Sequence, residues 1–450
     1  MGCCASSSGP SEPAGFRGYE AHGLQQRQLQ PDEELAVPDR SKALPRLPRP
    51  ADWRPVSLAT GPGTTFLAGG SNGTLAWYDA ATASLLGEAS LGGRSASNCT
   101  ASAPSGPVPT CVASSPGKAI TVWRLNAPGG ASADSSDALE LVASADAVKG
   151  ERVSGVDISA DARLVVTASK ETFVRLWDVE RGMAPSGRAS ASRNTATCVK
   201  LFPGSTIGRA LVAQGSEDLR VRLWDVRSPS AAVATTGTMH MCTCSLALAG
   251  YVYFPLSIDI HPNGRHILTS SRGVSGLGGE ARVWDVRMPS APLEVAAAAA
   301  EATELFSAPV VSPAAVDSPR LGPGVQVAVY SGHDADAGGC AWMPPAAALA
   351  SGIPGSFATA STDCTVRLWQ PRPDSDGTRH ADSDESAECI FRHVDSASLG
   401  FTQLCWLGDS MASSAVVTSS DGSLRVLEVS PEGRLAMTAE LADEPDEASE

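Results

Sequence analysis

The chain has 450 residues, of which 42% are hydrophobic and 18% charged, with a formal net charge of -15 and a pI near 5.0. This composition predicts a globular chain that can bury a large core. An acidic chain without clustered Lys and Arg is poorly suited to a phosphate backbone, so nucleic acid is not an expected partner. No segment approaches the roughly 18 consecutive apolar residues of a spanning helix, and no secretory signal is present, so we expect a cytoplasmic protein.

The N-terminal segment, residues 1–51, is rich in Pro, Ser and Gln and is predicted to be a disordered tail. It starts MGCCASSS, which fits the myristoylation motif at Gly2 and offers Cys3 and Cys4 for S-palmitoylation. One myristoyl chain binds a bilayer only weakly, and the first 50 residues carry six basic and six acidic side chains, so they form no basic patch. We therefore expect acylation at all three residues and a membrane-associated protein. The alternative is that MGCC is a chance start to the tail.

The same tail contains KALPRLP (42–48), a basic residue before a PxxP that could suit an aromatic-lined groove. Because such matches are common, the interpretation as a linker is favoured.

One strand pattern recurs seven times after the tail, with apolar and polar side chains alternating as in a half-buried strand. The segments are TLAWYDA (74–80), AITVWRL (119–125), FVRLWDV (173–179), VRLWDVR (221–227), ARVWDVR (281–287), TVRLWQP (365–371) and LRVLEVS (424–430). Their anchors are Trp77, Trp123, Trp177, Trp224, Trp284 and Trp369, with Leu427 in the seventh. Most follow a second short strand and a turn, such as LVVTASKET or SFATASTDC.

These paired strands resemble the hairpin of a WD40 repeat, and the resemblance implies an all-β, seven-bladed WD40 β-propeller at about 52–442. The expected blades are about 52–92, 108–146, 152–192, 195–236, 255–296, 325–393 and 400–442. An Ala/Pro-rich insertion occupies 289–324, and an acidic tail occupies 443–450. We expect each blade to keep its own four strands, with 434–441 supplying the last one.

The sixth repeat carries the fullest motif, with His333, Ser361, Asp363 and Trp369. The WD40 resemblance implies that these side chains form a buried hydrogen-bond network that holds the blade together. A His, an Asp and a nearby Ser could also suggest a hydrolase triad, but the spacing matches a blade. No motif for nucleotide, dinucleotide or zinc-protease chemistry occurs, so we expect no enzyme, no cofactor and no metal.

Two further features can be interpreted either as purely structural or as ligand-binding. His240 with Cys242 and Cys244 could bind a metal, but the spacing lacks the second ligand pair of a zinc site, and cysteines beyond the first two are interpreted as small core residues. The glycine-rich RGVSGLGGE (272–280) could cradle a phosphate, but no helix or Lys-Ser/Thr follows, so a long flexible turn is favoured.

Several segments resemble the family of WD repeat-containing protein 31. These are RASASRNTATCVKL (188–201), QGSEDLRVRLWDVR (214–227), GGEARVWDVR (278–287) and ATASTDCTVRLWQ (358–370). The resemblance covers about 150–430 and excludes the insertion. It implies a place in cilium assembly, with regulators of small GTPases in intraflagellar transport and in recruitment of the BBSome.

The first functional hypothesis is a monomeric, non-catalytic scaffold that binds other proteins through its faces and loops and is tethered at a plasma or ciliary membrane. The alternative is a substrate receptor of a cullin-4 ubiquitin ligase. VAQGSEDLRVRLWDVR (212–227) resembles the box that contacts its DDB-type adaptor, with Arg227 as the contact and Arg287 in the same place in the next blade. A G-protein β-subunit is disfavoured because prolines interrupt any long N-terminal helix.

Overall fold

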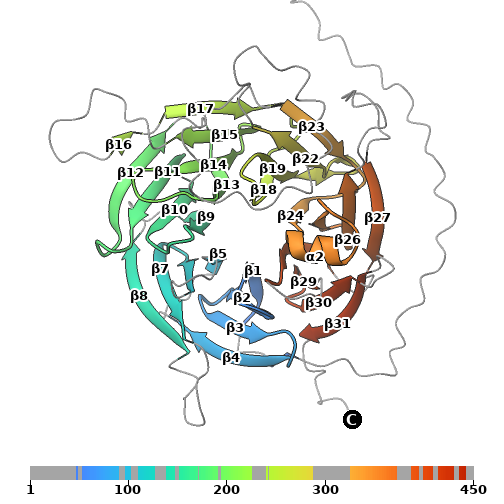
Figure 1. Ribbon diagram of the computed structural model, residues 1–450, viewed down its shortest axis with the longest axis horizontal. Coiled ribbons are helices and arrows are strands. Elements are labelled where there is room, and N and C mark those ends of the chain that lie inside the picture. The colour runs from blue at the N-terminus through green and yellow to red at the C-terminus, as the bar shows by residue number, and fades with distance from the viewer. Residues whose placement is uncertain are drawn as a thin grey trace, which may run out of the picture. The chain divides into compact units, whose positions relative to one another are not determined.

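The computed structural model describes residues 47–48, 53–90, 97–102, 110–126, 138–146, 152–170, 172–190, 194–225, 240–241, 243–286, 325–371, 387–394, 399–408, 414–429 and 435–441. All of them belong to the second of two units into which the chain divides, Leu44–Glu450. They form seven blades around a central axis, each built on a four-stranded antiparallel sheet, and a separate two-stranded sheet (Figure 1). The fold is a seven-bladed propeller, as predicted.

The first three blades follow one another along the chain. Blade one holds β1 (Pro55–Thr60), β2 (Thr65–Gly70), β3 (Leu75–Asp79) and β4 (Ser84–Ala89). Blade two holds β5 (Ser97–Ser102), β6 (Cys111–Pro116), β7 (Ala119–Leu125) and β8 (Leu139–Asp146). Blade three holds β9 (Val153–Ile158), β10 (Leu164–Ser169), β11 (Phe173–Asp178) and β12 (Ala184–Ser190).

The later blades carry additions. Blade four holds β13 (Ala196–Leu201), β14 (Leu211–Ser216), β15 (Arg220–Asp225) and β17 (Thr243–Leu248), and β16 (His240–Met241) pairs in parallel with β12 of blade three. Blade five holds β18 (Pro255–Ile260), β19 (His266–Ser271), β22 (Ala281–Asp285) and β23 (Val325–Tyr330), with the small hairpin β20 (Gly273–Val274) and β21 (Leu277–Gly278) between β19 and β22. Blade six holds β24 (Ala337–Trp342), the helix α2 (Pro345–Ala350), β25 (Phe357–Ser361), β26 (Thr365–Pro371) and β27 (Ala387–Val394). Blade seven holds β28 (Phe401–Trp406), β29 (Ser414–Ser419), β30 (Leu424–Val429) and β31 (Leu435–Leu441).

The Trp position of each third strand marks a bend in its sheet. The pairing of the third and fourth strands shifts register there, for example between Leu176 and Trp177 and between Leu368 and Trp369. In blade seven the shift falls between Val426 and Leu427, so leucine keeps the structural position without the indole. A β-bulge of this kind increases local twist, which suits the strongly twisted sheets of a propeller.

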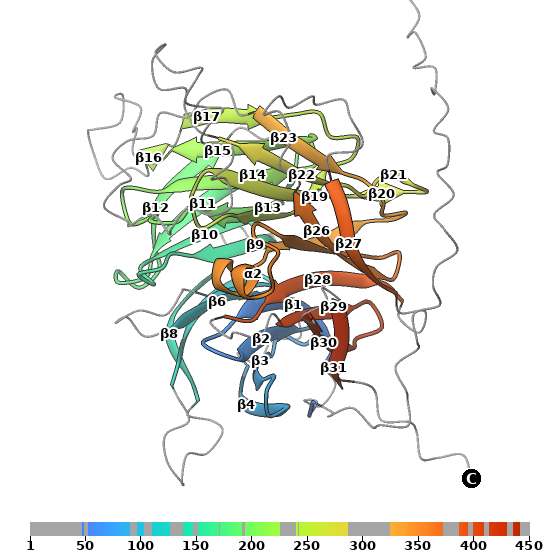
Figure 2. The ribbon, with the colours of Figure 1, turned by 45° about the vertical axis from the view of Figure 1, so that its right-hand side comes forward.

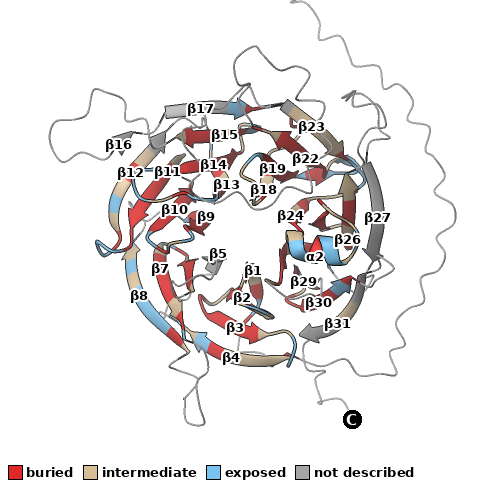
Figure 3. Ribbon diagram, viewed as in Figure 1, coloured by how far each residue is buried: buried red, intermediate tan, exposed pale blue. Residues whose placement is uncertain are grey.

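The core lies between neighbouring blades, where second and third strands are almost entirely buried (Figure 3). One cluster joins Leu176 of blade three to Val199 and Val212 of blade four. Second strands such as β10, β19 and β25 are buried along their whole length, so both faces of a blade present buried side chains and each blade packs against both of its neighbours. Among the described residues, no helix is long and apolar enough to cross a bilayer.

The ring closes between blades seven and one without an exchange of strands. β31 pairs with β30, as expected for a blade that keeps its own strands, and β1 contacts β28 and β5 on its two sides. The contact is sealed by Phe66 and Tyr78 packed with Val416 of blade seven. The Thr60 hydroxyl also donates to the carbonyl of Trp406 at 2.8 Å.

Three blade boundaries differ from the prediction. β23 pairs with β22 and completes blade five, whereas the sequence assigned residues 325–330 to blade six. β17 lies beyond the predicted end of blade four at 236, and β5 precedes the predicted start of blade two at 108. The reason is that first and fourth strands lack the Trp-Asp signature, so a long connection hides which blade they complete.

The predicted tail, 1–51, also ends differently. Leu47 is 4% exposed and packs in the cluster that seals blades one and seven. The hydroxyl of Tyr78 donates to the carbonyl of Pro48 at 3.1 Å. The end of the KALPRLP segment is therefore part of the folded blade and not of a free ligand motif.

Candidate interaction surface

His333, in the connection between β23 and β24, organises the hydrogen bonds of blade six. Its Nδ1 lies 3.0 Å from Oδ2 of Asp363, in the turn between β25 and β26, and its Nε2 lies 2.7 Å from Oγ1 of Thr359 on β25. The indole Nε1 of Trp369 donates to the same hydroxyl at 2.9 Å. The His333 side chain is 1% exposed, so these polar groups satisfy one another inside the blade.

Asp363 is held in its charged form within this network. Burial raises its pKa, but the hydrogen bond and charge of His333 and the hydrogen bond from Thr365 outweigh burial, so the pKa lies well below its usual range. The backbone N–H of Asp334 donates to Oδ2 at 3.1 Å as well. The carboxylate thus ties the connection into β24 to the turn between β25 and β26.

The prediction placed Ser361 in this network, and the structure places Thr359 there. The Ser361 hydroxyl instead accepts the backbone N–H of Asp363 at 3.1 Å. Ser361 and Thr359 face the same side of β25, because positions two apart share a face. Only Thr359 pairs with Arg367 and accepts the indole N–H of Trp369. Because Asp363 and Thr359 occupy both ring nitrogens of buried His333, these residues do not form an accessible hydrolase triad.

Blade five has the same arrangement with a different residue. Tyr251 lies in the connection into β18, and its hydroxyl lies 2.8 Å from Oγ1 of Thr269, which accepts Nε1 of Trp284 at 3.3 Å. Tyr251 lies four residues before its first strand, as His333 does. Arg282 stacks over the Tyr251 ring at 5.0 Å. Tyrosine therefore replaces histidine in blade five, which the sequence analysis missed.

The other anchors vary in their partners. Nε1 of Trp177 donates to Thr167 Oγ1 at 2.9 Å, that of Trp224 to Gln214 Oε1 at 2.7 Å and that of Trp123 to Thr121 Oγ1 at 2.9 Å. Nε1 of Trp77 has no partner among the described residues, since Gly69 occupies the position of the hydroxyl-bearing residue. All six predicted Trp anchors lie in third strands and are buried in the packing of the blades.

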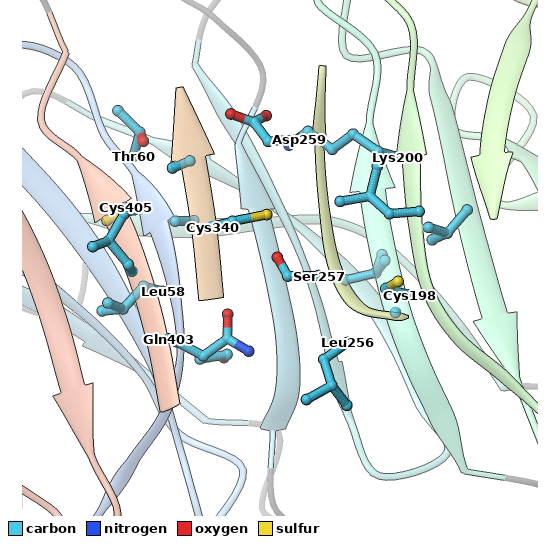
Figure 4. A pocket seen from close by; sticks show the side chains of 18 of the residues that line it. Leu58, Thr60, Cys198, Lys200, Leu256, Ser257, Asp259, Cys340, Gln403 and Cys405 are labelled. Carbon is cyan, nitrogen blue, oxygen red and sulfur yellow. The ribbon is translucent and has the colours of Figure 1, made fainter. Parts of the chain in front are cut away.

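The central channel contains a cavity of about 320 Å³, lined by first strands of six blades (Figure 4). Lys200 lies between two carboxylates here, with its Nζ 3.4 Å from Asp157 Oδ1. Asp157 raises the pKa of Lys200, whereas burial raises the pKa of Asp259 more than the lysine lowers it. Asp157 accepts the N–H of Leu201 at 2.7 Å and Asp259 that of Trp342 at 2.8 Å, so each carboxylate joins its blade to the next.

Three thiols also face or border this cavity. Burial raises the pKa of Cys198 to about 11 and those of Cys340 and Cys405 to about 12, so they are neutral at physiological pH. Within the described ranges, no group of three His, Cys, Asp or Glu side chains could hold a metal ion. Cys242 of the alternative metal cluster lies outside those ranges.

The two ends of the ring differ in exposed apolar side chains. We call the end where the chain enters each first strand the entry face and the opposite end the exit face. Turns between second and third strands also lie on the entry face, because neighbouring strands are antiparallel. Among the described residues, the exposed large apolar side chains of the entry face are Leu219, Val252, Val274, Leu277 and Leu399. Those of the exit face, among the described residues, are Ile207 and Leu349, and Leu141 and Val142 lie on the outer strand β8.

The glycine-rich 272–280 segment contributes two of these residues. The sequence predicted a flexible turn, but residues 273–278 form the hairpin of β20 and β21, which projects from the ring on the side opposite α2 (Figure 2). We call it the entry arm. Gly273 and Gly279 at its base pack against the backbone of Ala335.

Comparison with family profiles supplies the deciding sequence evidence. The profile of the WD domain, G-beta repeat, matches residues 142–178 and 324–370. The chain contains WD40 repeats. The two matched segments end on β11 and β26, the Trp-bearing third strands of blades three and six.

A comparison with curated proteins finds no match to this WD40 chain. The profile match therefore supports the WD40 repeat and does not extend to the family of WD repeat-containing protein 31. As a class, WD40 propellers serve as binding platforms for other proteins, so function is to be found on their surfaces.

Two sets of predicted functional residues lie outside the described residues of the WD40 propeller. Gly2, Cys3 and Cys4 belong to the first unit of the chain. Arg227 and Arg287, the alternative adaptor contacts, lie just beyond described ranges that end at Asp225 and Val286.

Proposed function

We propose that this protein is a scaffold that binds partner proteins through the entry face of its WD40 propeller. The observation that carries the proposal is the unequal distribution of exposed large apolar side chains among the described residues, of which five lie on the entry face, from blade four to the connection into blade seven, and two on the exit face. Exposed apolar side chains that cluster on one face are typical of protein interaction sites. In contrast, His333 in blade six and the channel carboxylates Asp157 and Asp259 are engaged in hydrogen bonds that hold the ring together.

Proximity labelling in cells with matched substitutions tests this proposal. We expect the double variant Leu219→Ser, Leu399→Ser to lose most labelled partners, because both leucines are exposed on the entry face. The control is Ile207→Ser, Leu349→Ser on the exit face, which should keep them. Equal partner sets for both double variants would contradict the choice of face.

The second part of the proposal is attachment to a membrane by acylation of Gly2, Cys3 and Cys4. Its support is the sequence MGCCAS. Stable anchoring needs a second acyl chain or a basic patch besides the myristoyl chain, and the balanced charge of the first 50 residues leaves a second acyl chain as the available choice. With an alkyne-tagged myristate, we expect incorporation into the wild type, none into Gly2→Ala, and full incorporation into the control Gly9→Ala. Cys3→Ser with Cys4→Ser should keep the myristate and lose stable membrane association.

A place in the cilium is the finer form of this proposal and is supported by the resemblance of the quoted segments alone. Expressing the same variants with a C-terminal tag in a ciliated cell tests it. We expect the wild type at the cilium and Gly2→Ala in the cytosol. A wild type distributed evenly through the cytosol would contradict both the anchor and the ciliary role.

The ligase-receptor alternative is supported by one sequence, Trp224-Asp225-Val226-Arg227. Its test is a pull-down of the DDB-type adaptor with Arg227→Ala, and Arg220→Ala, an exposed arginine of the same strand region, is the control. Equal recovery with wild type and Arg227→Ala would exclude this contact.

A further inference from the structure

The entry arm is a tight hairpin with a defined turn. Val274 pairs with Leu277, and the two residues between them, Ser275 and Gly276, have φ of 53° and 78°. Two successive positive φ values define the type I′ turn, which matches the twist of a two-stranded hairpin. The arm is therefore an ordered element built by its sequence and not a loose excursion.

Blade six holds the arm in place. The N–H of Gly273 donates to Oδ1 of Asp336 at 2.9 Å, and the N–H of Gly276 donates to the carbonyl of Asp334 at 3.0 Å. A Cβ on Gly279 would stand 2.3 Å from the carbonyl oxygen of Ala335, so this approach requires glycine. A hairpin fixed from the neighbouring blade loses little conformational entropy when a ligand binds.

Apolar side chains lie at the tip of this fixed hairpin. Leu277 is 64% exposed and Val274 is 44% exposed. Val252, in the connection into β18, is 55% exposed, and its neighbour Tyr253 contacts the arm at Gly278. These exposed apolar side chains lie on the entry arm and on the connection that contacts it, and a partner that covered them would remove them from water.

One carboxylate beside this surface is not neutralised by its neighbours. Asp336 pairs with Arg272, whose Nε lies 3.7 Å from Oδ1. Asp334 is exposed, its Oδ1 lies 3.8 Å from the point where a Cβ on Gly276 would stand, and its carboxylate forms no ion pair with a described residue. The formal charge of the whole chain, -15, has the same sign. Charge complementarity therefore favours a basic group next to the apolar contact.

We propose that the entry arm binds a peptide segment of a partner protein that carries large apolar side chains flanked by Lys or Arg. The inference rests on the proposed scaffold function and adds the site and the chemistry of the partner. The apolar side chains of the segment pack on Leu277, Val274 and Val252, and its basic side chain lies against Asp334.

The test is selection from a phage-displayed library of short random peptides on the immobilised full chain, followed by affinity measurements on the selected peptides by fluorescence anisotropy. We expect peptides enriched in Leu, Ile, Phe or Met next to Lys or Arg. Val274→Ser with Leu277→Ser should weaken binding at least about tenfold, since central apolar anchors dominate such contacts. Leu349→Ser is the matched control, because Leu349 is 62% exposed on the exit face, and it should bind as the wild type does.

The variant Asp334→Asn tests the contribution of charge to binding. We expect weaker binding of the selected peptides and a smaller effect of added salt, whereas Glu88→Gln, at an exposed carboxylate on β4, should change neither. Urea midpoints of all variants verify that each is folded.

If the selected peptides bind the wild type and the double variant Val274→Ser, Leu277→Ser equally, the proposal that the entry arm is the peptide site is wrong. The proposed scaffold function would be unaffected. Selection of acidic peptides, or of no peptides, would also contradict the proposed peptide site on the entry arm. The proximity labelling described above tests the scaffold function independently of either result.

Discussion

The hydroxyl of Tyr251 lies 2.8 Å from the hydroxyl of Thr269, and in the next blade Nε2 of His333 lies 2.7 Å from the hydroxyl of Thr359. In both blades the threonine hydroxyl also accepts the indole N–H of the Trp anchor. The same hydrogen-bond arrangement is thus made by Tyr251 in blade five and by His333 in blade six, both in connections on the entry face. It fixes the connection into the first strand, and so fixes the entry face from which loops meet partners.

Thr359→Val should destabilise the propeller, because it removes the shared partner of two buried ring nitrogens while preserving side-chain volume. Leaving buried polar groups unpaired costs about 1 to 3 kcal/mol each, so we expect a loss of about 2 to 4 kcal/mol in the free energy of unfolding. Urea denaturation measures it. Thr359→Ser should retain most of the stability, and a Ser361→Ala variant that loses more than Thr359→Val would contradict the assignment.

Asp363→Asn should remove part of the acid sensitivity of the fold. The pKa of Asp363 is lowered in the folded state, so its charged form stabilises the protein above the unfolded value of about 4, and this contribution is lost as the pH falls toward the folded pKa. We expect the variant to be less stable at pH 7 and to lose less stability than the wild type between about pH 5 and pH 3. Parallel pH dependence of the two proteins, measured by urea unfolding, would contradict this account.

Tyr251→Phe should cost about 1 to 2 kcal/mol of stability, since it deletes one buried hydroxyl and leaves Thr269 with one partner fewer. The matched control is Tyr253→Phe, whose residue is half-buried two positions away and should unfold at nearly the wild-type urea concentration. An equal effect of both changes would show that the Tyr251 hydroxyl has no special role.

The cavity thiols should resist alkylation in the folded protein. Burial raises the pKa of Cys340 and of Cys405 to about 12, so thiolate is scarce at pH 8, whereas Cys364 lies half-exposed in a turn. Iodoacetamide labelling read residue by residue by mass spectrometry should modify Cys364 in the folded protein, and Cys340 and Cys405 only after denaturation. Early labelling of Cys340 would contradict the packing of the channel.

The repeat of the third strands made the fold predictable, because the alternating pattern recurs at seven places and a second strand and turn precede most of them. The outer strands were harder to assign, since β23 and β17 follow long connections and carry no signature. The predicted fold class is nevertheless the one observed.

The site residues were predictable only in part. His333, Asp363 and Trp369 meet as expected, but Ser361 was chosen over Thr359. Aligning the second strands LVVTAS, LVAQGS, HILTSS and FATAS would have found the hydroxyl or amide opposite each arginine.

The entry arm was missed for a different reason. Gly273 and Gly278 of the arm, and Gly279 directly after it, were interpreted as sources of flexibility. In the fold they permit close packing on blade six, and this depends on a neighbouring loop that local sequence does not reveal.

The most direct test of the central claim is hydrogen–deuterium exchange of the full chain, with and without the partner recovered most strongly by proximity labelling. The account predicts that binding slows exchange on the entry face, at residues 217–220, 251–254 and 272–278, and leaves 203–208 and 345–350 unchanged. Protection of the exit-face segments, with none on the entry face, would contradict it.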